Sequence, residues 1–192
     1  MKSCKTKFLE SSILGQQINK TDKEAVILRC IELAYKDMMT AGRYYISSFS
    51  FDKAYICSNV EKLLSANNYS FSRDLIDKTS VFLFSSETVG SGNKYVSRYG
   101  LAQKLVNMTF KYFYVFEDYM FLGDNAIAFS NCDCPLDSII LSKIPDMECV
   151  WSKLTKKQYE KCQNTISEIL KNENIDDELN KLGNLAFDFI NW

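Results

Sequence analysis

The sequence contains no histidine among its 192 residues. This absence excludes a Ser-His-Asp triad, a Cys-His dyad, a histidine-ligated metal centre and a histidine general base. Any catalysis must therefore use Lys, Asp, Glu, Tyr, Cys or Ser side chains, or a metal ion held by carboxylates.

Proline and glycine are also scarce, with two and seven residues respectively. Turn-rich β-sandwiches and barrels need more of both, whereas long helices need little of either. Together with 46% hydrophobic residues, this composition predicts an all-α, compact multi-helix domain of about eight helices. The length suits one domain spanning residues 1–192, with room for a two-lobed arrangement around a cleft near residues 88–137.

The chain has no excess of charge of either sign, since its formal net charge is −1. Dedicated nucleic-acid binders usually carry a clear basic excess, because phosphate contacts supply most of their affinity. No run of 18 apolar residues is present, and the first residues lack the apolar core of a signal peptide. We therefore expect no membrane association, a cytoplasmic location and reduced thiols.

Metal sites find little support. The seven cysteines are an odd number, and Cys132 and Cys134 have no second cysteine pair with which to bind zinc. Adjacent acids at 117–118 and 176–178 lack the E-x-x-E spacing of facing helices, so a solvated acidic surface explains them better than a carboxylate-bound metal. We expect no metal and no cofactor.

Apolar residues recur at three- and four-residue steps through most of the chain, which predicts helices. A capping box formed by Thr21 and Glu24 should open one of them. Helices are expected at 8–18, 21–46, 54–66, 72–87, 101–120, 135–144, 155–174 and 175–192, with loops at 88–100 and 121–134. The VFLF run at 81–84 is also compatible with a short strand.

Two charged residues are unusual for their surroundings. Lys104, like Lys111, lies on the most apolar segment, and a helix starting near Gly100 would place Lys104 in its first turn. A lysine there opposes the helix dipole, which favours its neutral, nucleophilic form. Asp137 follows Pro135 in the first turn of the next predicted helix, where the dipole stabilises a carboxylate. For each residue alone, ordinary surface placement is the simpler explanation.

Considered together, the two elements resemble a known constellation. Gly100-Leu101-Ala102-Gln103-Lys104 and Cys134-Pro135-Leu136-Asp137-Ser138 are similar to the glycine–lysine and Pro-x-Asp-[Ser/Thr] elements of the helix-hairpin-helix DNA glycosylase superfamily. The 33-residue spacing between Lys104 and Asp137 resembles the archaeal 8-oxoguanine branch. The resemblance covers about residues 95–145.

The resemblance implies a glycosylase-like fold and a DNA glycosylase/AP lyase acting on a damaged base flipped out of double-stranded DNA. Lys104 would be the nucleophile, and Asp137 would stabilise the cationic sugar and help to activate the lysine. A neighbouring helix face could form the base pocket, with Phe110, Tyr112, Phe113 and Tyr114 as a stacking wall. Gln103 and Asn107 would either read a base edge or hydrogen-bond a neighbouring loop. The implied base-pocket or phosphate residues are Gly100, Gln103, Asn107, Tyr112 and Ser138.

A non-enzymatic alternative stays open. The chain could be a helical interaction or regulatory protein of bacterial or phage origin that acts through a protein partner. Lys104 and Asp137 would then form a structural salt bridge between two helices. Aromatic residues that could form an interaction surface in this case are Tyr44, Tyr45, Phe49, Phe51 and Trp192.

Overall fold

The computed structural model describes residues 22–42, 52–84, 86–91, 94–117, 127–173 and 175–191. These residues are mostly helical and include eight α-helices and one small two-stranded sheet, which confirms the all-α prediction. The predicted helix at 8–18, the Thr21 cap and the aromatics Tyr44, Tyr45, Phe49, Phe51 and Trp192 lie outside the described residues. The elements are α2 (Lys23–Gly42), α3 (Lys53–Ala66), α4 (Arg73–Leu83), β1 (Thr88–Ser91), β2 (Lys94–Ser97), α5 (Arg98–Val115), η2 (Phe129–Asn131), α6 (Ser138–Leu141), η3 (Trp151–Lys153), α7 (Lys156–Asn172), α8 (Asp177–Asn180) and α9 (Leu185–Asn191).

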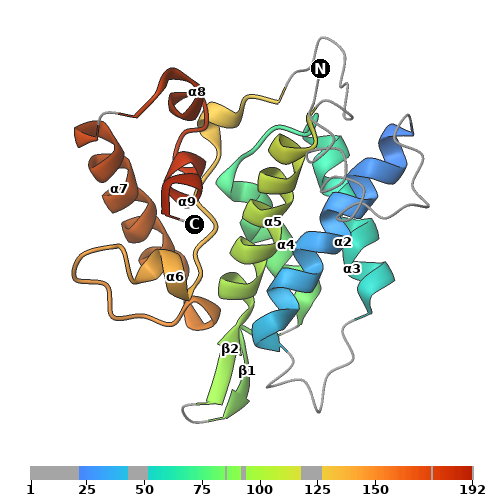
Figure 1. Ribbon diagram of the computed structural model, residues 1–192. Coiled ribbons are helices and arrows are strands. Elements are labelled where there is room, and N and C mark those ends of the chain that lie inside the picture. The colour runs from blue at the N-terminus through green and yellow to red at the C-terminus, as the bar shows by residue number, and fades with distance from the viewer. Residues whose placement is uncertain are drawn as a thin grey trace.

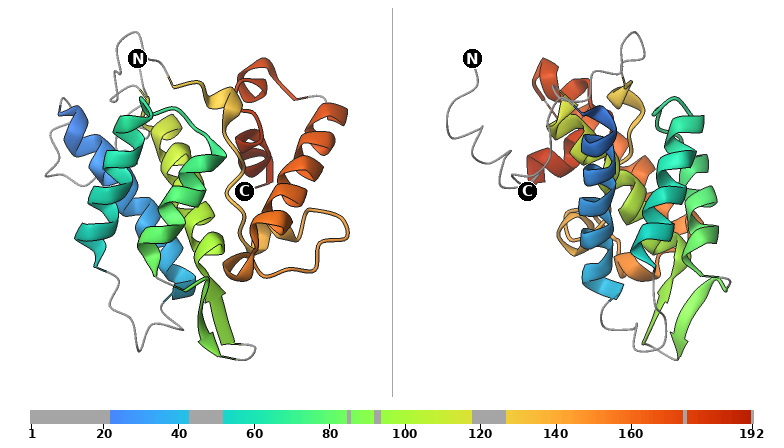
Figure 2. Two further views of the ribbon diagram at one scale, coloured as in Figure 1. Left: turned by 180° about the vertical axis from the view of Figure 1, so that it is seen from behind. Right: turned by 90° about the vertical axis from the view of Figure 1, so that its right-hand side faces the viewer.

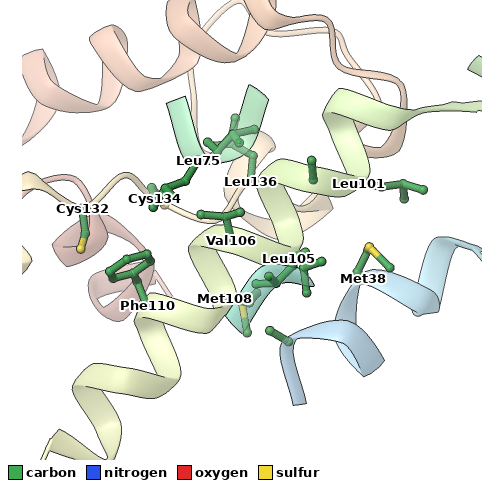
Figure 3. Packing of buried hydrophobic residues seen from close by; sticks show 14 of the residues in the cluster. Met38, Leu75, Leu101, Leu105, Val106, Met108, Phe110, Cys132, Cys134 and Leu136 are labelled. Atoms are coloured by element: carbon green, nitrogen blue, oxygen red, sulfur yellow. The ribbon is translucent and has the colours of Figure 1, made fainter. Parts of the chain in front are cut away.

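Helix α5 occupies the centre of the fold. It packs most extensively against α2 and α4 on one side, and the segments that carry α6 to α9 lie on its other side (Figures 1 and 2). In Figure 3, Met38 of α2 faces the side of α5 that carries Leu105, whereas Val106 and Phe110 point toward Cys132, Cys134 and Leu136. Packing on both sides explains why every residue of α5 from Tyr99 to Phe110 is buried.

Local signals account for several helix starts. Asp52 caps α3 by accepting a hydrogen bond from the Tyr55 N–H, and Thr155 and Gln158 form a capping box at α7. At α2, the Asp22 carboxylate accepts from the Ala25 N–H at 3.1 Å. Each bond satisfies an N–H group that the first helical turn cannot pair internally.

The prediction of a loop at 88–100 is wrong. Strands β1 and β2 pair antiparallel, with Val89 opposite Val96, and both valines are buried. Their apolar alternation extends over only four residues a strand, which is too short to stand out from a turn. The VFLF run, by contrast, is helical through Leu83 and forms no strand.

Two helices have other boundaries than predicted, and both differences affect the site. Helix α5 begins at Arg98, because the Ser97 hydroxyl accepts the Gly100 N–H at 2.9 Å and caps it. Helix α6 is limited to Ser138–Leu141, so Pro135 precedes the helix and Asp137 is its N-cap rather than a first-turn residue. The chain also ends in two short helices instead of one, separated at Gly183, whose φ of +55° favours glycine.

Candidate active site

Three neighbouring polar residues of α5 connect it to the irregular segment at 133–137. Gln103 donates to the Leu136 carbonyl at 2.9 Å and accepts from the Leu136 N–H at 3.1 Å. Asn107 donates to the Cys134 carbonyl at 3.2 Å and to the Tyr159 hydroxyl at 2.9 Å. Both side chains are buried. Gln103 and Asn107 thus hydrogen-bond a neighbouring segment, the second of the two roles considered for them.

Lys104 is the third of these residues, and it reaches Asp137. Its Nζ lies 2.9 Å from Asp137 Oδ2, and the side chains are only 8% and 17% exposed. With Arg98 as the first helical residue, Lys104 is the seventh, so the prediction that it lies in the first turn is wrong. The helix dipole therefore does not act on Lys104 as expected, because its effect fades beyond the first turn.

The Asp137 carboxylate is held in its charged form. Burial alone would raise its pKa, but the Lys104 charge and the backbone N–H groups of Ile140 and Ile139 outweigh burial. The pKa consequently lies below its usual value. The Ile140 bond, from its N–H to Oδ1 at 2.9 Å, is the cap of α6, so one carboxylate both starts a helix and binds the lysine.

Lys104 and Asp137 line an open hollow of about 620 Å³. Polar and apolar side chains share its wall, and they come from α2, α5, α6, η3 and α9. The lining residues are Asp37, Thr40, Lys104, Met108, Lys111, Tyr112, Asp137, Ser138, Ile139, Trp151 and Phe189. This volume falls within the range of small-molecule sites in proteins, roughly 300–1,000 Å³.

Two other polar side chains of the hollow, Tyr112 and Lys111, are also paired. The Tyr112 hydroxyl donates to Asp37 at 2.7 Å, and burial together with this bond raises the Tyr112 pKa, so the phenol stays protonated. Lys111 forms an ion pair with the buried Asp188. Burial raises the pKa of Asp188, although Lys111 opposes that shift.

The remaining predicted residues divide between the hollow and the core. Tyr112 and Ser138 line the hollow, whereas Phe110 and Phe113 are buried in the core and cannot form a stacking wall there. Gly100 is buried, and a Cβ at its position would lie 2.6 Å from the Trp151 carbonyl oxygen. The missing side chain at Gly100 thus lets the backbone of Trp151 approach α5 closely. The Gly100 N–H already donates to the Ser97 hydroxyl, so it is not available to a phosphate.

Sequence reasoning missed most of the rest of the hollow. Lys111 follows Lys104 by seven residues, about two helical turns, so this spacing could have placed both lysines on one face. Asp37, Trp151 and Phe189 lie on distant segments and carry no sequence signal linking them to α5.

A second polar cluster, centred on Asp133, was also missed. Arg73 binds the Asp133 carboxylate through two nitrogens at 2.6 and 3.0 Å, and the Tyr159 hydroxyl donates to it at 2.9 Å. Asp133 is buried, and its bonds connect α4 and α7 to the same segment that contacts α5.

In the acidic runs, Glu117, Asp176, Asp177 and Glu178 are exposed, and Asp118 lies outside the described residues. Asp176 accepts the N–H groups of Glu178 and Leu179 and thereby caps α8. Within the part of the chain that the structure describes, no three His, Cys, Asp or Glu side chains gather closely enough to hold a metal ion. None of the described helices combines the length and the apolar character needed to cross a bilayer.

Comparison of the chain with protein-family models, with curated proteins and with solved structures gave no match.

Proposed function

We propose that the protein is a DNA glycosylase/AP lyase-like enzyme that uses Lys104 as its nucleophile. One observation carries the proposal: Lys104 and Asp137, 33 residues apart, meet at 2.9 Å on the wall of an open hollow. An amine and a carboxylate side by side in a site of this size can form and stabilise a covalent bond to a sugar carbon.

The chemistry begins with deprotonation of Lys104. Attack requires a neutral amine, and Asp137 Oδ2 is the acceptor at hydrogen-bond distance from Nζ. Nζ then bonds to the sugar C1′ while the bond between C1′ and the base nitrogen breaks. The departing base takes the bonding electrons and the proton from Asp137. The carboxylate, charged again, faces the positive charge that is now on Nζ. It carries one proton from Nζ to the ring oxygen O4′; the C1′–O4′ bond breaks, and the nitrogen electron pair forms the protonated Schiff base between Nζ and C1′.

The wall of the hollow suits a flipped nucleobase. Trp151 and Phe189 are aromatic, and Met108 and Ile139 add apolar surface. Enzymes that act on flipped bases commonly hold them between aromatic or apolar side chains, with hydrogen bonds to the polar edge. Ser138 and Tyr112 are the nearby groups that can supply such bonds. The proposed partner is double-stranded DNA and the proposed compartment is the cytoplasm.

Borohydride trapping on a duplex that contains an abasic site tests the proposal. Reduction of the Schiff base should leave a stable adduct with the wild-type protein and none with Lys104→Arg. Arginine keeps the charge and the pairing with Asp137, so the loss of the adduct reports chemistry rather than unfolding. Lys111→Arg, the same exchange at the other lysine of the hollow, should still be trapped. A wild-type protein that gives no adduct refutes the proposal.

A second function has its own supporting observation. Gln103 and Asn107, which flank Lys104, both bind the segment at 133–137, so the Lys104–Asp137 pair extends a set of structural contacts. In a non-enzymatic helical interaction protein, the pair would serve only stability. Lys104→Arg would then match the wild type in unfolding, and neither protein would be trapped.

A further inference from the structure

A second hollow, of about 420 Å³, lies where the hairpin and the start of α5 meet the segment from η3 to α7. It shares no lining residue with the hollow at Lys104. Residues from α4, the hairpin, α5 and α7 form its wall. They are Asp77, Ser80, Glu87, Thr88, Tyr95, Ser97, Arg98, Tyr99, Lys153, Leu154, Thr155, Lys156 and Lys157.

Positive charge dominates this hollow. Its four cationic residues, Arg98 and the lysines at 153, 156 and 157, face only two carboxylates, those of Asp77 and Glu87. The whole chain has a net charge of −1, so this concentration of cations is local. Lys156 pairs with Asp77 at 2.6 Å, and the two side chains are 51% and 37% exposed. An exposed pair of this kind is weak enough for another anion to displace the carboxylate.

The start of α7 adds backbone donors. The capping box directs the Gln158 N–H to Thr155, and the Tyr159 N–H binds the Thr155 carbonyl at 3.0 Å. The first two N–H groups of the helix, those of Lys156 and Lys157, have no hydrogen-bond partner within the described residues. Unpaired N–H groups at a helix N-terminus, reinforced by the helix dipole, favour anions.

A buried hydroxyl supplies an independent observation. Tyr99 lines the hollow and is only 9% exposed, and its hydroxyl has no hydrogen-bond partner in the part of the chain that the structure describes. Burial, reinforced by Asp77 and Glu160, raises the Tyr99 pKa, so the phenol remains a donor at neutral pH. A buried polar group without a partner is costly unless a ligand or water satisfies it.

We propose that this hollow binds a phosphate group, held by the α7 N-terminal amides, by Lys157 and its neighbouring cations, and by the Tyr99 hydroxyl. Phosphate is the anion whose several oxygens can engage amides, ammonium groups and a phenol together. The hollow is larger than phosphate alone requires, and the Tyr95 ring, with Lys153 Nζ 4.7 Å from its centroid, offers a face for an attached nucleoside. The proposal does not depend on any reactivity of Lys104.

Isothermal titration calorimetry with three ligands tests the site: inorganic phosphate, adenosine monophosphate and a short duplex DNA. Saturable binding that weakens with salt is the expected result, because charge neutralisation contributes to it. Tightest binding of the mononucleotide would identify a nucleotide as the source of the phosphate, and tightest binding of the duplex would identify the nucleic-acid backbone. A wild-type protein that binds none of the three overturns the proposal.

Matched variants locate the binding. Lys157→Glu should weaken phosphate binding by at least about tenfold, the effect of one charge-assisted hydrogen bond. Lys161→Glu makes the same charge change on an exposed residue of α7 outside the hollow and should have less than a twofold effect. Tyr99→Phe should weaken binding severalfold without lowering the thermal midpoint, because it removes a hydroxyl that has no partner. If both lysine variants lost the same phosphate affinity, binding would depend only on the net charge of the protein, and the proposal would be overturned.

Discussion

Replacing Lys104 by methionine should destabilise the protein through its effect on Asp137. Methionine keeps most of the side-chain volume but leaves a carboxylate that is only 17% exposed without its counter-ion. Breaking one partner of a buried pair typically costs about 3–5 kcal/mol. Asp137 retains its bond from the Ile140 N–H and is partly exposed, so we expect a cost below that range, about 2–3 kcal/mol. For a chain of this size, the melting temperature should fall by roughly 5–10 °C.

Urea unfolding followed by far-UV circular dichroism measures this cost. The midpoint should move to lower urea while the slope m stays unchanged, because the surface exposed on unfolding is nearly the same. Lys78→Met provides the matched control, since Lys78 pairs with Asp74 on α4 but both side chains are more than half exposed. That variant should lose less than about 0.5 kcal/mol.

A double-mutant cycle with Asp137→Asn isolates the pair itself. Asparagine can still cap α6, so this substitution removes the charge with little change in geometry. The coupling energy between Lys104→Met and Asp137→Asn should exceed about 1 kcal/mol. If Lys104→Met costs no more than Lys78→Met, the burial argument fails and the contact is only a surface ion pair.

The sequence was most informative where the signal is local. Helix α7 was predicted correctly because its apolar residues recur at helical spacing within one continuous segment. The hairpin at 88–97 was missed because each strand offers only four residues of alternation. The predicted start of α5 near Gly100 was two residues late, because the Ser97 cap was not recognised, and the true start at Arg98 removes Lys104 from the first turn.

Contacts between residues distant in the sequence could be predicted only where a motif resembled that of a known family. The resemblance of two short motifs to a known family is what suggests that Lys104 and Asp137 lie together. Helical periodicity predicts neighbours only within one helix, so it could not predict this contact. The partners of Gln103 and of Asp133 had no such guide. The Asp133 carboxylate binds Arg73, which lies 60 residues earlier in the sequence, and no motif around either residue predicts the contact.

Three further outcomes follow from the geometry. Asp133→Ala should cost about 2–3 kcal/mol in urea unfolding, because it leaves the buried Tyr159 hydroxyl without its acceptor and the partly exposed Arg73 without its carboxylate; a loss below 1 kcal/mol would mean that solvent replaces the carboxylate. Gly183→Ala should cost at least about 2 kcal/mol, since φ is +55° and the new Cβ would lie 2.2 Å from the Ser130 carbonyl oxygen; a melting temperature equal to that of the wild type would contradict this. The third outcome concerns pH. Asp137 has a folded-state pKa below its unfolded value of about 3.9, so the native state binds protons less readily than the unfolded chain and its ionised form stabilises the fold. That contribution is fully present above the unfolded pKa and is lost as the pH falls through the folded one. The difference in unfolding free energy between the wild type and Asp137→Asn should therefore be constant from about pH 7 to 5 and shrink below about pH 4. A difference that stays the same down to pH 3 would show that the charge of Asp137 contributes nothing to stability.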